Sequence, residues 1–448
     1  MNETIAAIST AFGEAAISVL RLSGADALAV AGKVFASKQH VQKLAPRMQH
    51  LGRIMDDDGR TVDEVLLTVF KAPASYTGED VIEISSHGGI LVTRRIYELL
   101  LSNGARAAEP GEFTQRAFLN GKMDLTQAEA VMDLIHAQSE LALKAATQQL
   151  EGRLGKAAET LREDLIQLLA HLEAYIDFPD EDIDPETGTS LLARMNGLLA
   201  QLRALLATAE HGRILRSGAR TVICGEPNVG KSSLLNLLSG FERAIVSPQA
   251  GTTRDTIEEV LHIHDLPFLL VDTAGLRHST DDIEQSGIAR TNKELSRADV
   301  VLEVVDGSRP KQEAKRVVLA AAQRGHILIL NKSDLGVHET WLGENSVPLS
   351  CTTQQGVEAL RFAMRDAVWS GAATGNDQLL AINARHQNCF ERAASALTKA
   401  VEAMQRREAP EFIALDVREA LQAVGEVTGR VDVEEILGAI FASFCIGK

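Results

Sequence analysis

Short apolar runs alternate with turn residues through the first 118 residues. Three runs rich in β-branched and other apolar residues, at 15–22, 64–70 and 81–85, are separated by Gly, Pro and Ser and predict strands. Near residues 91–101 the apolar spacing changes to three and four, which predicts a helix. Residues 1–118 are therefore expected to form an α+β domain.

A helical pattern follows, in which Leu and Ala recur three and four residues apart from about residue 119 to residue 207. An acidic turn with two prolines at residues 177–185 interrupts it and is typical of a solvated helix end. The helical pattern returns after residue 375 and continues to residue 448.

Between the two helical segments lies an α/β pattern. Apolar strands alternate there with helical stretches, which indicates a parallel sheet covered by helices. The strands are expected at residues 221–224, 268–271, 300–305 and 327–330. Because helical segments flank this unit, we expect an insertion: an α/β domain at residues 216–372, placed within one helical domain made of residues 119–215 and 373–448.

Length and composition are those of a globular protein. The chain has 448 residues, enough for about three domains, and 45% of them are apolar. No signal peptide is expected from the opening residues, and no apolar stretch reaches the ~20 residues of a membrane helix. The four cysteines are widely spaced and lack a CxxC pair, which favours reduced thiols and a cytoplasmic location.

The net charge of −16 argues against indiscriminate nucleic-acid binding, which depends on exposed Lys and Arg. It does not exclude a local basic patch or a basic partner. Any role on a nucleic acid is therefore expected to be specific.

A phosphate-binding loop is predicted by GEPNVGKS at residues 225–232. This complete GxxxxGK[ST] motif follows a predicted strand and precedes a helical pattern. Its glycines let main-chain N–H groups point at phosphates, Lys231 can reach the β and γ phosphates, and the Ser232 hydroxyl can ligate Mg²⁺. The helix N-terminus adds the positive end of its dipole.

Two further motifs belong to the same kind of site. DTAG, at residues 272–275, places Asp272 near Mg²⁺ and the Gly275 N–H near the γ-phosphate. GTTRD, at residues 251–255, supplies Thr253 as a second hydroxyl ligand for Mg²⁺.

The base is selected by NKSD at residues 331–334. The Asp334 carboxylate can accept the paired N–H groups of guanine, a pair that adenine lacks. The wrong base would leave this charge without its partners. The ordered series of motifs predicts a domain that binds and hydrolyses GTP.

The motifs do not identify the residue that orients the attacking water. Leu276 follows the DTAG glycine, where many signalling GTPases carry Gln, and no arginine finger is evident in the sequence. The acids of the next loop, Asp281, Asp282 and Glu284, are candidates, and spacing favours none of them.

Several segments outside the nucleotide motifs resemble those of one family. They are VLRLSG (19–24), SYTGEDVIE (75–83), HGG (87–89), PGEFTQRAFLNGKMDLTQAEA (110–130), DFPDEDI (177–183) and the terminal FCIGK. With GEPNVGKSS, GTTRD, DTAGLR and NKSD, they make the chain resemble the MnmE (TrmE) family of tRNA-modification GTPases over essentially its whole length. The implied fold class is α/β and α+β multidomain, with an N-terminal α+β folate-binding domain, a discontinuous α-helical domain and an inserted Ras-like P-loop GTPase domain.

The resemblance implies an activity and its partners. The N-terminal domains pair two chains into a homodimer, which joins the FAD-dependent protein MnmG in a heterotetramer or larger complex. Together they add an aminomethyl or carboxymethylaminomethyl group to carbon five of the wobble uridine of certain tRNAs. The one-carbon unit comes from methylene-tetrahydrofolate, and the N-terminal domain holds a tetrahydrofolate derivative (5-formyl- or methylene-tetrahydrofolate).

The resemblance also implies how GTP is hydrolysed. Hydrolysis of GTP with Mg²⁺ depends on K⁺ and on the two G domains meeting face to face, and K⁺ takes the place of an arginine finger. Glu284 becomes the residue that orients water. The implied K⁺ ligands are Asn228, Ser247, Gln249 and Thr252, with Ser247 and Gln249 acting through main-chain carbonyls.

The nucleotide contacts that the motifs and the resemblance imply are Asn228, Val229, Gly230, Lys231, Ser232, Ser233, Ser247, Pro248, Gln249, Ala250, Gly251, Thr252, Thr253, Asp272, Thr273, Ala274, Gly275, Asn331, Lys332, Asp334, Ser350 and Cys351. The implied folate contacts are Arg21, Glu83, Lys122 and Lys448. One segment departs from the family, because FGEAA at residues 12–16 replaces a Gly-Arg-rich turn and adds Glu14 at that rim of the folate site.

The terminal FCIGK segment has a cysteine four residues from its end, as a prenylation signal does. Gly447 and Lys448 do not fit that signal. The resemblance implies instead that the segment folds back near the folate site and that Cys445 is a reduced thiol with a catalytic role in the modification. A buried cysteine that only packs is the alternative.

Two other functions stay open. A regulatory GTPase of the ribosome-assembly kind also uses GxPNVGKS and potassium, but it has no use for the N-terminal motifs. A folate-binding or one-carbon-transfer protein would use the G domain only as a scaffold, and it would lack K⁺-dependent GTP turnover.

Overall fold

The computed structural model describes residues 3–177, 187–240, 258–271, 294–311, 325–369, 380–431, 434–442 and 444–447. The chain divides into two compact units. The first comprises Met1–Met132, Leu150–Leu192 and Ser395–Lys448, and the second Asp133–Gln149 and Ala193–Ala394. The fold class is the predicted one, with an α+β sheet domain, long helices and an α/β nucleotide-binding fold.

The first unit begins with a seven-stranded sheet in the order β3-β4-β5-β6-β2-β1-β7. Neighbouring strands are antiparallel except β1 and β7, which are parallel. The strands are β1 (Ile5–Ile8), β2 (Ile17–Ser23), β3 (Phe35–Ala36), β4 (Gln49–Met55), β5 (Thr61–Phe70), β6 (Val81–His87) and β7 (Arg106–Ala107). The three predicted strands are confirmed as β2, β5 and β6.

Two helices, α1 (Ala27–Val34) and α2 (Ile90–Ser102), pack on one face of this sheet. Because side chains alternate along a strand, every second residue joins this core. The core residues on β2, β5 and β6 are Leu20, Leu22, Val65, Leu67, Val69, Ile82 and Ile84. The residues between them, including Arg21 and Glu83, lie on the opposite face.

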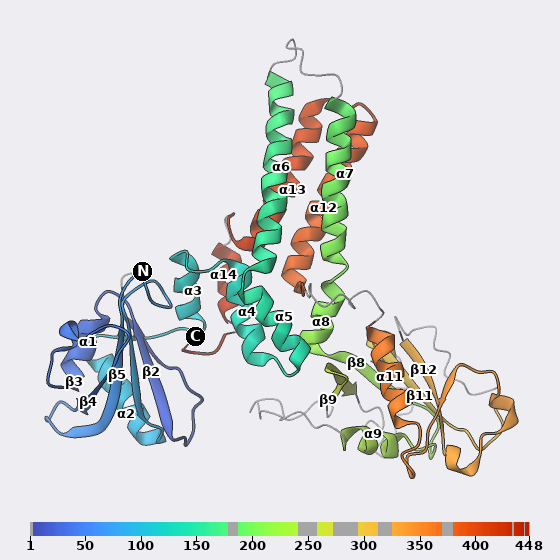
Figure 1. Ribbon diagram of the computed structural model, residues 1–448, viewed down its shortest axis with the longest axis horizontal. Helices are drawn as coiled ribbons and strands as arrows, with labels where there is room; N and C mark the ends of the chain where they lie inside the picture. The colour runs from blue at the N-terminus through green and yellow to red at the C-terminus, as the bar shows by residue number, and fades with distance from the viewer. Residues whose placement is uncertain are drawn as a thin grey trace, which may run out of the picture. The chain divides into compact units, whose positions relative to one another are not determined.

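Helices from distant parts of the chain complete the first unit. Helix α6 (Arg153–Asp177) packs along α13 (Pro410–Thr428), as Figure 1 shows. It buries leucines at the spacing that the sequence predicts, namely Leu161, Leu165, Leu168 and Leu172. An ion pair of 2.6 Å between Arg418 and Glu173 also joins the two helices.

Other helices among the described residues are α3 (Glu112–Leu119), α4 (Leu125–His136), α5 (Glu140–Leu150), α7 (Thr187–Leu206), α8 (Ala209–Ser217), α12 (Ala384–Gln405) and α14 (Glu434–Ala442). Among the described residues, no helix is both long enough and apolar enough to span a bilayer.

The second unit contains a six-stranded sheet in the order β13-β12-β11-β8-β10-β9. The strands are β8 (Ala219–Cys224), β9 (Glu258–Ile263), β10 (Leu266–Val271), β11 (Val300–Asp306), β12 (Gly325–Asn331) and β13 (Ser346–Pro348). The predicted strands and their parallel pairing are confirmed, but β9 was not predicted and runs antiparallel to β10. The short turn at His264 and Asp265, both with positive φ, permits only an antiparallel return.

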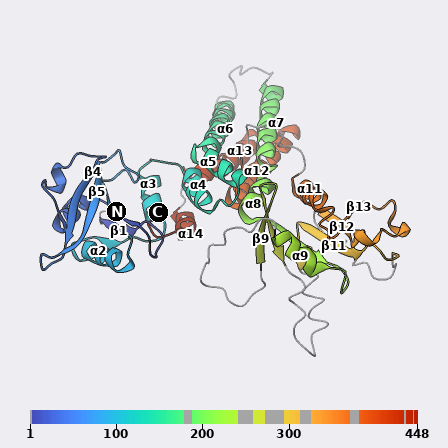
Figure 2. The same ribbon diagram turned by 60° about the horizontal axis from the view of Figure 1, so that its bottom comes forward.

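Helices α9 (Lys231–Ser239) and α11 (Val357–Val368) lie beside this sheet (Figure 2) and contribute buried residues to its core. Leu234 and Leu238 of α9 and Leu360 and Met364 of α11 are fully or almost fully buried in this core. Parallel strands bring their carboxyl ends to one edge, where α/β proteins bind ligands. The phosphate loop follows β8 at this edge, and the NKSD segment follows β12.

Candidate functional site

The loop between β8 and α9 is shaped by two glycines. Gly225 has φ of +142°, and a Cβ there would lie 2.2 Å from the Val304 carbonyl oxygen. Gly230 has φ of +102°, and a Cβ would lie 2.1 Å from Nδ2 of Asn331. No side chain fits at either position, so both glycines are required by the close approach of neighbouring groups. The resulting cradle follows the strand and ends at a helix N-terminus, as a phosphate site needs.

Lys231 is the first residue of α9 and curls over this loop. Its Nζ donates hydrogen bonds to the carbonyls of Gly225 (3.0 Å) and Glu226 (2.6 Å). The side chains of Ser232 and Ser233 are exposed in the same turn. An ammonium group, the N–H groups of a first helical turn and a serine hydroxyl together suit the phosphates of a nucleotide and Mg²⁺.

Asn331 joins the phosphate loop to the base-binding motif. Its Nδ2 donates to the Val229 carbonyl at 2.7 Å, and its Oδ1 accepts from the Cys351 N–H at 3.3 Å. The Asn331 residue is almost fully buried. One side chain therefore holds together the ends of β8 and β12 and the segment after β13.

The neighbours of Asn331 complete the base side of the candidate site. Lys332 pairs with Asp306 at 2.7 Å. Burial opposes ionisation of Asp306, but the hydrogen bonds from Lys332 and Ser308 prevail and lower the pKa of Asp306. Asp334, the predicted base contact, is exposed and accessible to a ligand.

The segment after β13 is rigidly held. Ser350 is fully buried, and its Oγ accepts from the Thr353 N–H at 3.1 Å. Burial raises the pKa of the partly buried Cys351 thiol, although the hydrogen bond with Asn331 acts in the opposite direction. Cys351 is therefore a neutral thiol at pH 7, and its main chain supplies the contact to Asn331.

Much of the predicted site lies outside the described residues. This applies to Ser247, Pro248, Gln249, Ala250, Gly251, Thr252, Thr253, Asp272, Thr273, Ala274, Gly275, Glu284 and Lys448. Asn228 is described and has φ of +65°, a left-handed conformation at the turn of the phosphate loop. In the part of the chain that is described, no three His, Cys, Asp or Glu side chains cluster as metal ligands.

Two of the predicted folate contacts meet on the sheet of the first unit. Arg21 on β2 lies directly opposite Glu83 on β6. Nε and one terminal nitrogen of Arg21 both donate to Oε1 of Glu83, at 3.0 and 2.7 Å. The guanidinium also lies over the rings of Tyr76 and Phe113, at 5.4 and 5.8 Å from their centroids. Oε2 of Glu83 has no donor among the described residues.

The third described contact, Lys122, donates from Nζ to the Pro73 carbonyl at 2.9 Å. The aromatic neighbours of Arg21 were not predicted as site residues, although Tyr76 and Phe113 both lie in segments on which the family resemblance rests. Burial raises the pKa of Tyr76, against the opposing influence of its hydrogen bond with Thr114, so its phenol is neutral.

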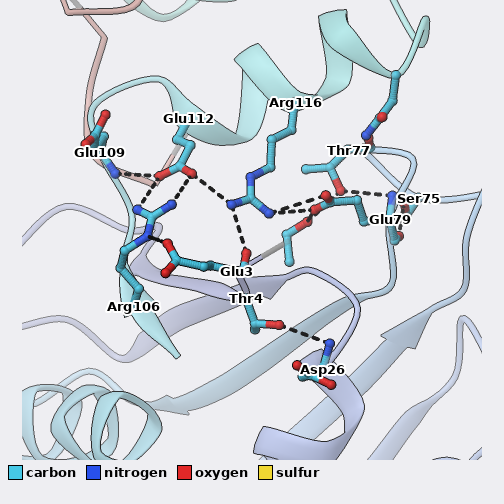
Figure 3. Close-up of polar contacts among 12 residues, drawn as sticks. Glu3, Thr4, Asp26, Ser75, Thr77, Glu79, Arg106, Glu109, Glu112 and Arg116 are labelled. Atoms are coloured by element: carbon cyan, nitrogen blue, oxygen red, sulfur yellow. Dashed lines mark hydrogen bonds and ion pairs between the residues drawn. The ribbon is translucent and has the colours of Figure 1, made fainter. Parts of the chain in front are cut away.

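A buried ion network, also not predicted, holds this region together (Figure 3). Arg116 on α3 is 2% exposed and pairs with Glu112 at 2.8 Å and Glu79 at 3.0 Å. Arg106 binds both carboxylate oxygens of Glu112, Oε1 at 2.7 Å and Oε2 at 2.9 Å. Glu79 also accepts from Ser23 Oγ at 2.7 Å, two residues along β2 from Arg21. The network fixes α3 and the loop carrying Tyr76 beside the Arg21–Glu83 pair.

The C-terminal segment packs on the N-terminal sheet domain within the same unit. Ile446 forms an antiparallel bridge with Pro110, and Ser9 Oγ donates to the Gly447 carbonyl at 3.3 Å. The Gly111 N–H lies 3.4 Å from the Cys445 carbonyl. The Cys445 side chain is exposed, so the alternative that this cysteine is buried packing is wrong for this conformation.

Three features define a P-loop GTPase fold: the strand–loop–helix cradle, Lys231 over it, and the NKSD segment, whose Asn331 bonds the Val229 carbonyl in the cradle. Two family models match the chain, the MnmE helical domain over residues 125–445 and the GTP-binding protein TrmE N-terminus over residues 4–122. The chain belongs to the MnmE (TrmE) family of tRNA modification GTPases.

Full-length relatives agree with this assignment. The tRNA modification GTPase MnmE of Akkermansia muciniphila is 52% identical over 449 residues, covering 100% of this chain and 99% of that protein. The protein of the same name from Aquifex aeolicus is 43% identical over 453 residues, covering 100% of both chains. Among solved structures, the G domain of the T. maritima FeoB iron transporter is 27% identical, with a TM-score of 0.26, and the match covers 33% of this chain and 98% of that one.

Proposed function

We propose that this chain is the GTP-hydrolysing component of a cytoplasmic tRNA-modifying enzyme. With the FAD-dependent protein MnmG, it adds an aminomethyl or carboxymethylaminomethyl group to carbon five of the wobble uridine of certain tRNAs. It acts as a homodimer within a heterotetramer or larger complex. The observation that carries the proposal is the match of the entire chain, N-terminal and helical parts included, to relatives named for tRNA modification.

GTP and Mg²⁺ bind at the carboxyl edge of the second unit's sheet. Lys231 and the N–H groups of the first turn of α9 bind the phosphates, and the hydroxyls of Ser232 and Thr253 ligate Mg²⁺. Asp334 accepts the N–H pair of guanine. Asn331 links the phosphate loop to the segment after β13 through its hydrogen bonds with Val229 and Cys351.

Hydrolysis is stimulated by K⁺ and by the meeting of two G domains. A cation at the transferred phosphoryl group stabilises charge in the transition state, as an arginine finger does in other GTPases. Glu284 orients the attacking water. The proposed K⁺ ligands are Asn228, Ser247, Gln249 and Thr252.

A tetrahydrofolate derivative binds beside the Arg21–Glu83 pair. Arg21 engages only Oε1 of Glu83, so Oε2 can accept N–H groups from a pterin ring. Lys122 and Lys448 supply positive charge for the glutamate tail. The exposed thiol of Cys445 acts in the modification itself, because its segment packs on the N-terminal sheet domain.

Reconstitution tests this function. The chain is mixed with MnmG, a substrate tRNA, methylene-tetrahydrofolate, GTP and K⁺, and each component is omitted in turn. Mass spectrometry of the tRNA nucleosides should detect the modified uridine only in the complete mixture. GTP turnover should fall when Na⁺ replaces K⁺.

The outcomes separate the alternatives. Unmodified uridine in the complete mixture, together with K⁺-dependent GTP turnover, would favour a regulatory GTPase of another kind. Folate binding without GTP turnover would favour a one-carbon protein with a scaffold G domain.

A further inference from the structure

A buried carboxylate holds an exposed imidazole at the end of β6. Nδ1 of His87 lies 2.7 Å from Oδ1 of Asp63, and the His87 main-chain N–H donates to Oδ2 of the same residue at 2.9 Å. The Asp63 side chain is 10% exposed and the His87 side chain 75%. Both carboxylate oxygens are therefore used to fix one residue in place.

This geometry assigns the protons of the neutral imidazole. The carboxylate needs a donor, so Nδ1 carries the hydrogen and Nε2 keeps its lone pair. Nε2 has no partner in the described part of the chain. A carboxylate that orients an imidazole in this way and stabilises its charged form is the arrangement that enzymes use for a general base.

His87 lies at the end of the strand that carries Glu83. Residues 83 and 87 are four apart on β6, with Cα atoms about 13 Å apart. The strand register places Arg21 opposite Glu83 and Ile17 opposite His87. Nearby on β4 and β5, Arg53 and Glu64 pair with each other at 3.7 Å, which leaves Asp63 as the charged partner of the imidazole.

Substitution at carbon five of uridine creates a need for a base. The C5=C6 electron pair forms the new bond to the electrophilic carbon of the one-carbon unit, whose own bonding pair moves to the nitrogen that carries it. The electron pair of the C5–H bond then restores the C5=C6 double bond. The hydrogen leaves as a proton and must be accepted. No oxidant or reductant takes part in this step.

We propose that Nε2 of His87 accepts the proton from carbon five of the target uridine, with Asp63 as its positioning residue. This inference rests on the proposed function. It gives a role to the first residue of the HGG segment at residues 87–89. The proton then passes from the exposed imidazole to water.

Tritium release tests the step directly. A tRNA carrying [5-³H]uridine is incubated with MnmG, folate, GTP and K⁺, and tritium in water is counted. General bases contribute about 10²–10⁴-fold, so His87→Ala should slow release at least about 100-fold. Because the site is open to solvent, added imidazole should restore part of the rate, which a purely structural defect would not allow.

A second readout needs neither folate nor tRNA. Diethyl pyrocarbonate acylates a neutral imidazole nitrogen, and mass spectrometry follows the modification of each histidine. His87 should react several-fold faster in the wild-type protein than in Asp63→Asn, where Nδ1–H loses its charged acceptor. His50 on β4, whose Nε2 lies 2.9 Å from the Ala45 carbonyl, provides the control, and His50→Ala should release tritium at the wild-type rate.

The possible results distinguish this inference from the proposed function. Wild-type release by His87→Ala, or by a folded His87→Gln, would overturn the role of His87 while leaving the function intact. His87 would have a structural role instead if added imidazole did not restore release and the variant unfolded at a lower temperature than the wild type. Absence of release from the wild-type protein would contradict the proposed function itself.

Discussion

The side-chain amide of Asn331 donates a hydrogen bond to the main-chain carbonyl of Val229, at 2.7 Å, across 102 positions of sequence. The same side chain accepts from the Cys351 N–H. The phosphate loop, the guanine motif and the segment after β13 thus share one buried amide. Asn331 is a structural part of the nucleotide site as much as a contact to its ligand.

Replacing Asn331 by Ala should weaken GTP binding. The change leaves the buried carbonyl of Val229 and the N–H of Cys351 without partners, which costs about 1–3 kcal/mol for each buried group. We expect GTP affinity, measured by isothermal titration, to fall about 10-fold or more. Asn236→Ala, on the exposed side of α9, is the matched control and should bind as the wild type does. Equal affinity of the two variants would contradict the bridging role.

Asp334→Asn should change the choice of base. An amide cannot accept both N–H groups of guanine, but it can donate to the second carbonyl of xanthine. Binding of GTP should weaken and binding of xanthosine triphosphate should strengthen in competition experiments. A variant that retains the wild-type preference for GTP would show that another residue selects the base.

Glu284→Ala should separate binding from hydrolysis. Glu284 lies outside the described residues, and its proposed role is to position water. The variant should bind GTP normally and lose at least about 100-fold in single-turnover hydrolysis, in the range that positioned bases and water-orienting residues contribute. Asp281→Ala and Asp282→Ala are the controls. Full hydrolysis by Glu284→Ala would show that Glu284 does not orient the attacking water and would favour Asp281 or Asp282.

The buried ion network should make the first unit sensitive to acid. Burial favours the neutral form of Glu112, but hydrogen bonds from Arg106, from the Glu109 N–H and from Arg116 prevail and lower its pKa from 4.5 to about 2. A lowered folded-state pKa stabilises the fold above pH 4.5, and this stabilisation is lost as the pH falls toward 2.

Glu112→Gln tests this contribution. At pH 7 the variant should be less stable by about 3–5 kcal/mol, because Arg106 and the buried Arg116 lose their charged partner. It should also lose less stability than the wild type between pH 4.5 and pH 2. Urea unfolding followed by hydrogen exchange in α3 measures both effects. Glu98→Gln, which breaks an exposed pair with Arg94, should shift stability by less than about 1 kcal/mol.

Cys445→Ser should abolish tRNA modification and leave GTP hydrolysis unchanged. Serine keeps the size and the main-chain contacts of the segment, so the bridge between Ile446 and Pro110 should persist. Nucleoside mass spectrometry and phosphate release give the two readouts. If the variant still modifies tRNA, Cys445 has no role in that reaction.

Local sequence pattern was sufficient to predict part of the secondary structure of this protein. Strands β2, β5 and β6 and helix α2 follow from apolar periodicity, because alternation and three-to-four spacing are local properties of a chain. The hairpin of β9 and β10 was not predicted, because β9 carries no strong apolar alternation and the turn between the two strands contains no glycine. The phosphate loop, in contrast, could be predicted because its glycines and lysine lie close together in the sequence.

The sequence by itself determined the nucleotide motifs, the family resemblance and the residues proposed to act on GTP and folate. Tertiary structure decided which of them meet. Arg21 and Glu83 pair because β2 and β6 are neighbours in register, and Asn331 reaches Val229 because β8 and β12 end at one sheet edge. Asp63 meets His87 for the same kind of reason. Such contacts join residues tens of positions apart, and only chain topology brings them within hydrogen-bonding distance.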